Sequence, residues 1–461
     1  MTKRRAISLF GILLLVAAAG VAAALLLTNR REATTSSEAA YRLWREAIDN
    51  ERRFYMKEAR TGFAKALELD PDFAAAMLGL ARQSEKEQAL SLLHRAERLK
   101  SRLTERERLH VDLGLAAWEK GPAERLKIAR EILRRYPDDF RATTIVAMEE
   151  VQNGRMEEAV RLFTRLLEAD PNSADAYNQI GYYYGYRGEY ERAIENLKKY
   201  QFMAPDQANP HDSLGEIQAY SGHYDEAIQN LNRALSVKPD FFASYDHLGV
   251  VYEGRGDYAR ARDHFLRAAE LSPLMKEGYL FKAIRVTMEA GDRDMFRSIA
   301  ERFEKLPKSE YSDVNAEFLR ACERMIEGRP ADAEHLLAEL RPKAEAIFLK
   351  RNRTAGRKFY EPGWNYLMAR ALIAQGRESE ALPLLEEMAS PPNPWEGFEG
   401  RQMVYDGRAQ FAALLAKRGD LDRAEKLLEE NKRWNPSWAP TRPAETTVAE
   451  LRRARVLASA K

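Results

Sequence analysis

The residue types that most often perform chemistry occur in this chain without the spacing that chemistry needs. None of the seven histidines lies in a His-Glu-x-x-His or nucleophile motif. Residues 354–358 lack the leading glycine and the following Ser or Thr of a phosphate-binding loop. Cys322 is the only cysteine, which excludes a metal cage built from several thiolates. We therefore predict no enzymatic activity, no metal site and no cofactor. The histidines are His94, His110, His211, His223, His247, His264 and His335.

Two neighbouring pairs, His211–Asp212 and Asp246–His247, have the composition of an acid–base pair. Both fall at recurring positions of a repeated pattern, and a recurring position is explained by packing or by the lining of a surface. Carboxylates are also frequent, because 31% of the residues are charged. We therefore interpret these pairs as part of the repeat.

The repeat itself is marked by proline and glycine. Five prolines lie 34 residues apart, and four glycines keep the same period, each 17 residues ahead of a proline. A fixed period of this length indicates a stacked array of structural repeats. The prolines are Pro137, Pro171, Pro205, Pro239 and Pro273, and the glycines are Gly154, Gly188, Gly222 and Gly256.

Between each glycine and the next proline, apolar residues recur with the 3.6-residue period of a helix, and a second helix precedes each glycine. Gly188 and Gly222 can close a helix in the left-handed conformation, and proline suits the first turn of the next helix. Each unit is therefore predicted to be a helical hairpin. Small residues are expected to meet where its helices cross. These are Gly181, Gly215 and Gly249, facing Ala193, Ala227 and Ala261.

The unit that ends at Pro273 resembles the tetratricopeptide repeat family at nearly all of its characteristic positions: Tyr245, Leu248, Gly249, Tyr252, Gly256, Tyr258, Ala261, Phe265 and Ala268. Weaker copies occur on both sides. The resemblance implies an all-α fold, an α-solenoid of roughly ten to eleven hairpins over residues 38–437, with the best repeats at 138–273. We expect one extended body in which each unit packs only on its neighbours.

In this family the first helix of each hairpin lines a concave surface that holds a protein or peptide. The resemblance implies a groove that is acidic and rich in amides and tyrosines. The implied groove residues are Asp175, Asn178, Gln179, Tyr182, Tyr186, Asn209, Asp212, Ser213, Glu216, Tyr220, Asp246, His247, Val250 and Glu253.

Asp212 and Asp246 stand where the family's carboxylate clamp has a basic residue or an asparagine, so a carboxylate tail would be repelled. We expect a basic or polar, extended ligand instead. An equally weighted interpretation is that these acids only solvate a helix face. Substituting Tyr182, Tyr186 or Asp212 is expected to weaken partner capture without unfolding the chain.

The N-terminus contains a second strong feature. Residues from Ala6 to Leu27 carry no charge, and basic residues flank them within 1–31. A bilayer core of about 30 Å needs roughly 20 apolar residues in a helix, so this segment can be a membrane anchor. A cleaved signal peptide, followed by secretion, is the alternative. The basic flank favours an N-terminus in the cytoplasm, with the repeats facing the periplasm from an inner membrane. Residues 32–37 are expected to be a short polar tether.

The distribution of charge argues against nucleic acid as a partner. The chain has 73 basic and 71 acidic residues in total, but residues 138–273 hold 14 basic and 23 acidic residues. The best repeats therefore carry a net charge of −9, whereas a nucleic-acid groove requires positive charge.

The least regular stretches are 343–362 and 390–404, which are expected to form long loops or a bend. A basic run at 350–358 is interpreted as a solvated loop. The C-terminal tail, 438–461, offers one more helix from Thr447 to Ser459. Thr447 followed by Glu450 has the spacing of a capping box, and this helix is expected to seal the open end of the array.

Two further motifs, Leu103–Leu109 and Tyr136–Asp139, resemble a repeat module that follows the membrane helix in some bacterial receptor-type kinases and regulators; a kinase domain is not expected in this chain. Together, these features predict a membrane-anchored scaffold for protein–protein interactions in bacterial envelope assembly or secretion. The alternative is a regulatory or sensor subunit that transmits ligand binding to a membrane partner.

Overall fold

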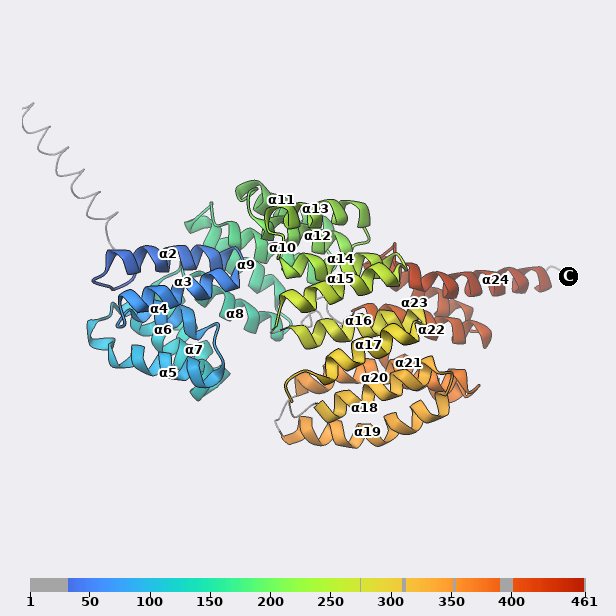
Figure 1. Cartoon of the computed structure of the whole chain (residues 1–461). Coiled ribbons are helices and arrows are strands. Elements are labelled where there is room, and N and C mark those ends of the chain that lie inside the picture. The colour runs from blue at the N-terminus through green and yellow to red at the C-terminus, as the bar shows by residue number, and fades with distance from the viewer. Residues whose placement is uncertain (1–31, 274, 309–311, 351–353, 390–400, 460–461) are drawn as a thin grey trace, which may run out of the picture. The chain divides into compact units, whose positions relative to one another are not determined.

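The computed structural model describes residues 32–459, except for residues 274, 309–311, 351–353 and 390–400. Within residues 348–350 and 354–361 it describes the helical backbone but no side chain. All regular structure within these residues is helical, which confirms the predicted all-α class (Figure 1). The predicted membrane segment, Ala6 to Leu27, lies outside the described residues. Among helices α2–α24, none combines the length and the apolar character that crossing a bilayer requires.

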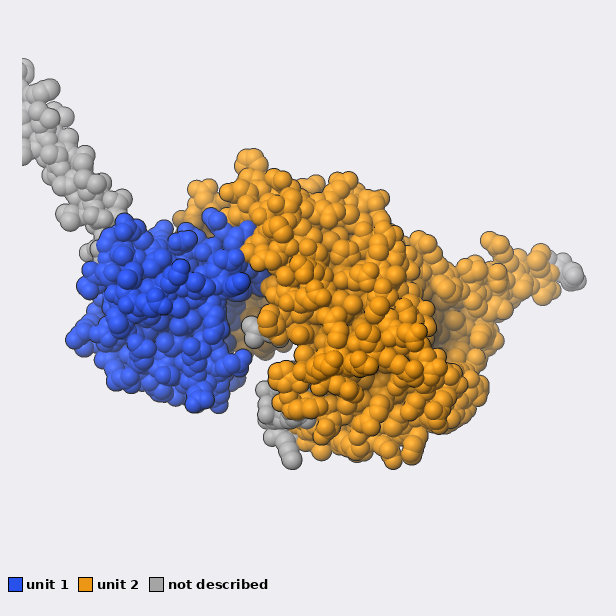
Figure 2. All heavy atoms as spheres, viewed as in Figure 1, with its two compact units in different colours: residues 1–146 blue, residues 147–461 orange. Residues whose placement is uncertain are grey.

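The chain groups into two compact units, residues 1–146 and 147–461, with the division inside α8 (Figure 2). The sequence suggested one extended body, without an internal boundary of this kind. The first unit contains α2 (Glu38–Arg52), α3 (Met56–Leu69), α4 (Ala74–Ala81), α5 (Lys86–Arg98), the 3₁₀ turn η1 (Lys100–Arg102), α6 (Glu105–Leu115), the π-helical turn η2 (Ala116–Lys120), α7 (Pro122–Arg135) and the start of α8 (Phe140–Gln152).

The second unit begins within α8 and holds the repeats with the clearest sequence pattern. Its helices are α9 (Met156–Ala169), α10 (Ala174–Tyr186), α11 (Tyr190–Met203), α12 (Ala208–Tyr220), α13 (Tyr224–Val237), α14 (Phe242–Gly254), α15 (Tyr258–Leu271), α16 (Lys276–Ala290), α17 (Arg293–Glu304), α18 (Ser312–Ile326), α19 (Pro330–Lys350), α20 (Thr354–Ala374), α21 (Glu378–Met388), α22 (Arg401–Lys417), α23 (Leu421–Trp434), the 3₁₀ turn η4 (Ala439–Thr441) and α24 (Arg442–Ser459).

Helices α2–α23 follow one another as eleven pairs, in agreement with the predicted ten to eleven hairpins. The turn within a pair depends on glycine, as the sequence indicates. Gly188 and Gly222 have φ of 75° and 80°, a left-handed conformation that costs other residues free energy. The chain can therefore reverse within two or three residues and lay the second helix against the first.

The helices of a pair approach closely at a glycine, but the partner differs from the prediction. A Cβ on Gly181 would lie 2.7 Å from Cγ of Leu197, and one on Gly249 would lie 2.6 Å from Cδ1 of Phe265. The predicted partner Ala193 meets Gly181 only through its carbonyl oxygen, at 3.3 Å. The glycine therefore makes room for a large apolar side chain one helical turn further along. Leu197 and Phe265 are both fully buried in this way.

Residues 32–37 do not form the free tether that the sequence suggested. Ala33 is only 1% exposed, and Thr34 bonds through its backbone N–H and its hydroxyl to the Glu107 carboxylate, at 2.6 and 2.7 Å. Thr35 donates to Asp70, and Ser37 caps α2. Short hydroxyl side chains bond readily to nearby backbone and carboxylate groups, which is why a segment that is polar in sequence is docked on the first unit.

Two predictions about the C-terminal part are also corrected. The expected loop at 343–362 is helical wherever it is described, because α19 and α20 continue through Pro342 and Pro362. Residues 390–400 lie outside the described residues, and 401–404 begin α22. The last helix does reach Ser459, but it starts at Arg442. Thr447 therefore lies inside this helix, where its hydroxyl donates to the carbonyl of Pro443 instead of forming a capping box.

The second unit also contains contacts between segments that are distant in the sequence, although we expected each repeat to pack only on its neighbours. Residues of α22, α23 and the segment that follows pack against the turns of α10–α14, more than 180 positions earlier in the chain. Tyr224 donates to Oδ1 of Asn435 at 3.2 Å, and Asn435 donates to the carbonyl of Ala219 at 3.3 Å. The C-terminal hairpin α22–α23 thus packs on the middle of its own array as well as on α21.

Candidate interaction site

The predicted groove residues lie on three first helices, α10, α12 and α14, at neighbouring repeats. The five on α10 are half-buried. Those on α12 and α14 are mostly buried: Asp212 is 2% exposed, Val250 and Glu253 are 1% exposed, and Ser213, Tyr220 and Asp246 are also buried. Asn209, Glu216 and His247 are half-buried. The sequence therefore placed these residues on corresponding helices, but it overestimated how much of them reaches the solvent.

Side chains on successive first helices bond to one another across the repeats, and we call this chain of contacts the polar ladder. It begins at Tyr182 on α10, whose hydroxyl donates to Oε2 of Glu216 at 2.6 Å and contacts Oγ of Ser213 at 3.2 Å, both on α12. Burial, and then the Glu216 carboxylate, raise the pKa of Tyr182 well above its usual value. The phenol therefore stays protonated and acts as a hydrogen-bond donor.

The centre of the polar ladder is His247 on α14, which lies between two carboxylates of α12. Its Nδ1 is 3.1 Å from Oδ1 of Asp212, and its Nε2 is 3.5 Å from Oε1 of Glu216. Ser244 donates to the same Asp212 oxygen at 2.7 Å. Burial acts to lower the pKa of His247, but the carboxylates of Asp212 and Glu216 outweigh it and raise this pKa to about 10. A charged imidazole therefore joins two repeats at neutral pH.

The polar ladder continues onto α16, which lies beyond the best sequence repeats. Nζ of Lys282 donates to both carboxylate oxygens of Asp246 at 2.8 Å. Arg285 binds Glu253 through both terminal nitrogens, with Nη2 to Oε2 at 2.6 Å. A two-point contact of this kind is the strong form of an arginine–carboxylate pair.

The polar ladder changes the interpretation of the groove. Asp212, Glu216, Asp246 and Glu253 already have cationic or hydrogen-bonding partners within the chain, so they do not form a free acidic surface for a basic ligand. Removing one member of such a buried pair leaves the other charge uncompensated. Substitution of Asp212 is thus expected to destabilise the repeats, which revises the expectation that it would only weaken partner capture.

The part of the predicted groove that remains accessible lies on α10. Asn178 and Gln179 are half-buried and precede Tyr182 by four and three residues, so they share its helix face. Within the described residues, Oδ1 of Asn178 is buried and has no hydrogen-bond partner. The rings of Tyr182 and Tyr186 lie 6.0 Å apart on the same face. An amide and tyrosine surface suits a polar, extended chain, since both residue types combine contact area with hydrogen bonding.

The turn side of the same repeats is covered by the C-terminal hairpin. Nη2 of Arg401 donates to the carbonyl of Tyr186 at 2.9 Å, and its guanidinium lies 4.6 Å from the centre of the Trp434 ring. Gln402 contacts the Tyr220 hydroxyl at 3.4 Å. The groove helices are therefore closed at their C-terminal ends by residues of the same chain.

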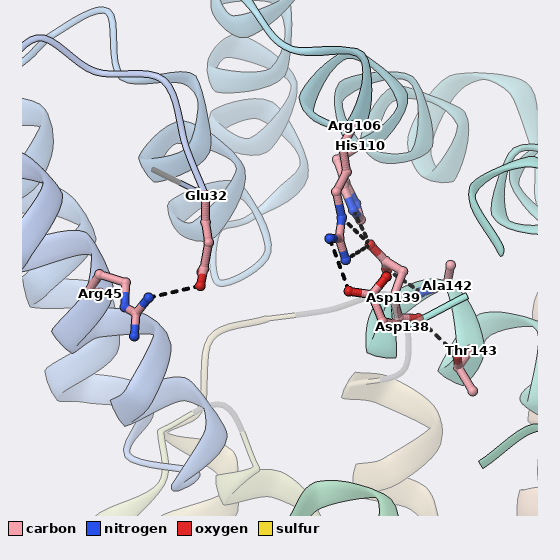
Figure 3. Close-up of polar contacts among 8 residues, drawn as sticks. All are labelled: Glu32, Arg45, Arg106, His110, Asp138, Asp139, Ala142 and Thr143. Carbon is pink, nitrogen blue, oxygen red and sulfur yellow. Dashed lines mark hydrogen bonds and ion pairs between the residues drawn. The ribbon is translucent and has the colours of Figure 1, made fainter. Parts of the chain in front are cut away.

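The first unit contains a separate polar cluster, at the two motifs that resemble a bacterial receptor module. Arg106 and His110 lie one turn apart on α6 and both reach Asp139, at 2.8 Å from Arg106 Nη2 and 2.8 Å from His110 Nε2 (Figure 3). Asp139 also accepts the backbone N–H of Ala142 at 3.0 Å, and its carbonyl accepts the Thr143 hydroxyl at 2.9 Å. Burial acts to raise the pKa of Asp139, but these donors and the nearby charges lower it overall.

This cluster joins the two motifs directly. Thr104 and Glu107 form a capping box at the start of α6, and Glu107 also binds Thr34. The Arg106 guanidinium lies 5.2 Å from the centre of the Tyr136 ring. The motif residues thus hold α6, the start of α8 and residues 32–37 together. Their arrangement is structural, since each polar group meets another group of the chain.

Reactive groups elsewhere are accounted for by packing. Among residues that the structure describes, no group of three His, Cys, Asp or Glu side chains is placed to hold a metal ion. Cys322 lies buried on α18, and burial raises the pKa of its thiol to about 12. A thiol that is neutral and buried is a poor nucleophile.

Consecutive helical hairpins with a polar inner surface define a helical-repeat protein. Residues 126–174 and 213–275 match one family model of the tetratricopeptide repeat, and residues 162–195 match a second. Residues 126–195 and 213–275 are therefore similar to tetratricopeptide repeats, in line with the resemblance in the sequence.

Solved structures with a similar run of helices include crystal structures of MamA. One is 22% identical with a TM-score of 0.29 and covers 34% of this chain and 93% of its own. A second is 24% identical with a TM-score of 0.27, covering 34% and 87%. A MamA double mutant (RS-1 ArsTM) is 19% identical with a TM-score of 0.29, covering 36% and 91%. Likeness at this level does not bear on function. No curated protein matches the chain.

Sequence reasoning missed Ser244, Lys282 and Arg285, which complete the polar ladder. A signal for them exists, because the bonded pairs recur at about one repeat: Tyr182 and Glu216 are 34 residues apart, and Asp246 and Lys282 are 36 apart. Complementary side chains one period apart therefore indicate contact between repeats. The contacts of Arg401 and Asn435 have no comparable signal, since they join segments with no regular spacing.

Proposed function

We propose that this protein is a scaffold that binds another protein through its tetratricopeptide repeats, at a surface centred on α10. The observation that supports this most directly is the accessible amide and tyrosine face formed by Asn178, Gln179 and Tyr182. The polar ladder holds the neighbouring first helices in register, so this face is rigid before a ligand arrives. A pre-formed surface loses less conformational freedom on binding than a flexible one.

The proposed ligand is a polar segment in an extended conformation. The carboxylates of α12 and α14 are paired with other groups of the same chain. We therefore do not propose that the ligand has to be rich in basic residues. The amide of Gln179 can donate to and accept from a peptide backbone, the amide nitrogen of Asn178 can donate to it, and tyrosine rings supply contact area. The proposal assigns no catalytic activity to the chain.

We further propose that Ala6 to Leu27 anchors the scaffold in a bacterial inner membrane, with the repeats in the periplasm, where the scaffold would serve envelope assembly or secretion. The uncharged stretch and its basic flanks support this. Carbonate extraction of membranes and protease access to the repeats from the periplasmic side test both parts. Secretion after signal cleavage is the competing outcome, and it would release a protein that lacks the N-terminal signal peptide.

A second candidate function, a regulatory subunit, is favoured by the docking of residues 32–37. Thr34 binds Glu107, and Glu107 caps α6, so a displacement of the predicted anchor would be transmitted directly to the first unit. Replacing Thr34 with alanine removes one of the two bonds to Glu107. Under this candidate function the substitution changes the activity of a membrane partner while capture of that partner stays constant.

The experiment that tests the scaffold proposal is a double substitution, Asn178→Ala with Gln179→Ala, in the full chain. Among the described residues neither side chain makes a hydrogen bond, so the repeats are expected to keep their stability. Capture of crosslinked partners, quantified by mass spectrometry, is expected to fall at least tenfold. A matched control is Gln229→Ala, an exposed amide on α13. Equal capture by both variants and the wild type would reject the α10 surface.

A further inference from the structure

A group of charged residues lies where the C-terminal hairpin meets the central repeats. We call it the acid–arginine cluster: Glu253 on α14, Arg285 and Glu289 on α16, Arg370 on α20, and Asp406 on α22. These helices come from three different parts of the second unit: α14 and α16 are yellow-green to yellow, α20 is orange and α22 is red-orange in Figure 1. The cluster is thus the point at which segments distant in sequence share one electrostatic environment.

Two of its three carboxylates are matched by arginines. Glu253 binds Arg285 through both oxygens, and Glu289 binds Arg370 and accepts the Tyr366 hydroxyl at 3.2 Å. Asp406 has a different partner, because it accepts Nε1–H of Trp438 at 2.9 Å, a neutral donor. Among the residues that the structure describes, the three carboxylates of this cluster therefore face two guanidinium groups, and Asp406 is the acid that has no ion-pair partner.

Groups from several helices act on Asp406 through their charge or through a hydrogen bond. They are Glu253 from α14, Tyr258 from α15, Arg285 and Glu289 from α16, Tyr366 from α20, and Trp438 after α23. The carboxylates of Glu253 and Glu289 repel a negative charge on Asp406. The Arg285 guanidinium attracts this charge, but it is already paired with Glu253. When Asp406 is neutral the cluster is balanced, and when it is charged the cluster carries an excess negative charge away from water.

Burial, followed by the charge of Glu253, raises the pKa of Asp406 to about 7. An exposed aspartate has a value near 3.8. A carboxyl whose pKa is raised on closure stabilises the closed state fully below the open-state value, and this stabilisation is lost as the pH rises through the closed-state value. The affected window therefore runs from about pH 4 to pH 7, with no further change above it.

The same hairpin covers a tyrosine-rich edge of the repeats. Around the cluster, Trp438 packs on Gly254, and Tyr224 donates to Asn435. Further along, Arg401 binds at Tyr186 and Tyr190, and Gln402 at Tyr220. Release of this hairpin would expose tyrosines at the turns of two consecutive hairpins, α10–α11 and α12–α13, next to the accessible face of α10.

We infer that the C-terminal hairpin α22–α23 is an intramolecular cover over the tyrosine-rich edge, and that protonation of Asp406 strengthens its closure. The cover closes most tightly in mildly acidic conditions and is weakest at pH 7 and above. It opens without a ligand, so this inference does not depend on the scaffold proposal. When Asp406 loses its proton, the acid–arginine cluster gains an excess negative charge. The tyrosine-rich edge then becomes accessible for binding.

Hydrogen exchange of the full chain, followed by mass spectrometry between pH 5 and 8, tests this inference without a partner. Protection factors, corrected for the intrinsic pH dependence of exchange, are compared for peptides of 401–438. For the wild type they are expected to fall by about tenfold per pH unit up to about pH 7 and then to level off. In Asp406→Asn they are expected to stay constant and no lower than in the wild type.

The matched control is Glu429→Gln, which removes an exposed acid from the same hairpin and is expected to behave like the wild type. A flat wild-type profile would overturn the inference even if the Asp406 variant failed to fold. An identical slope in the wild type and in Asp406→Asn would also overturn it, because another group would then control closure. Unchanged partner capture by the variant with Asn178→Ala and Gln179→Ala would count against the scaffold surface and not against the cover, because the exchange profile is measured without a partner.

Discussion

At the scale of single residues, the most informative position is His247. One imidazole lies between the carboxylates of Asp212 and Glu216, and its raised pKa keeps it charged at neutral pH. The arrangement has the composition of an acid–base site, yet each polar atom of the histidine meets a group of the chain itself. Its charge therefore serves to join α12 to α14.

We predict that Asp212→Asn lowers the free energy of unfolding by about 3 kcal/mol, as expected when one partner of a buried charged pair is removed. The control Glu191→Gln, at an exposed position of α11, is expected to change it by less than about 0.5 kcal/mol. The free energies follow from urea denaturation of the full chain. A cost for Asp212→Asn as small as that of the control would mean that the ladder contributes little.

The same variant has a predictable pH dependence. Because the pKa of His247 is raised to about 10, its charge stabilises the fold fully below the unfolded value of 6.5. This stabilisation is lost as the pH rises through about 10. Asp212→Asn lowers the pKa of His247 and should flatten the stability profile between pH 7 and 10. NMR titration of the His247 ring measures this shift, and an unchanged titration would contradict it.

In the first unit, Asp139 combines an ionic and a capping role. Asp139→Asn keeps an oxygen for the Ala142 N–H but loses the charge that faces Arg106 and His110, whereas Asp139→Ala loses both. We predict a cost of about 1 kcal/mol more for alanine than for asparagine, the typical value of a helix cap. Hydrogen exchange of α6 measures both variants, and Asp138→Asn, whose side chain is 59% exposed, is the control.

Asp139 is expected to lose its stabilising effect at low pH, whereas His247 loses its stabilising effect at high pH. The pKa of Asp139 is lowered in the fold, so its stabilisation is present above the unfolded value of 3.8 and is lost as the pH falls below it. The protection of α6 in the wild type should therefore decrease in acid more steeply than in Asp139→Asn. Parallel profiles for the two proteins would contradict this assignment.

At the scale of elements, the helical hairpin was predictable because its determinants are local. Glycine and proline at fixed offsets set the helix ends, and the apolar stripe sets the buried face. The crossing partner was not predictable from small residues alone, since Phe265 and Leu197 fill the space that glycine leaves. The helices through Pro342 and Pro362 were missed because residues 343–362 lack a regular sequence pattern, although a neighbouring sequence of good helix formers can continue past a proline.

Two glycines of the second unit test this packing. Gly249→Ala places a Cβ against the Phe265 ring and is expected to cost about 1–2 kcal/mol, after the gain in helix propensity is included. Gly278→Ala, on α16, meets nothing within 4 Å and is expected to stabilise the fold by about 0.5 kcal/mol. Urea denaturation compares them directly. Equal effects would show that propensity outweighs the close crossing.

At the scale of the whole molecule, the sequence predicted the repeat array but not the contacts between its C-terminal hairpin and its central repeats. Contacts between Arg401 and Tyr186, or Asn435 and Ala219, join residues more than 200 positions apart, and no period in the sequence relates them. The docking of Thr34 on Glu107 was missed for the same reason. The acids assigned to the groove lie on the first helices of neighbouring hairpins, but their partners depend on side-chain geometry across repeats.

The functional account depends on whether the face of α10 meets another protein. The direct measurement is photo-crosslinking in living cells from a reactive amino acid placed at residue 179 of the full chain, with residue 229 on α13 as the reference position. The account predicts a discrete protein adduct from 179 that exceeds any adduct from 229. No adduct from 179, or the same adducts from both positions, would contradict it.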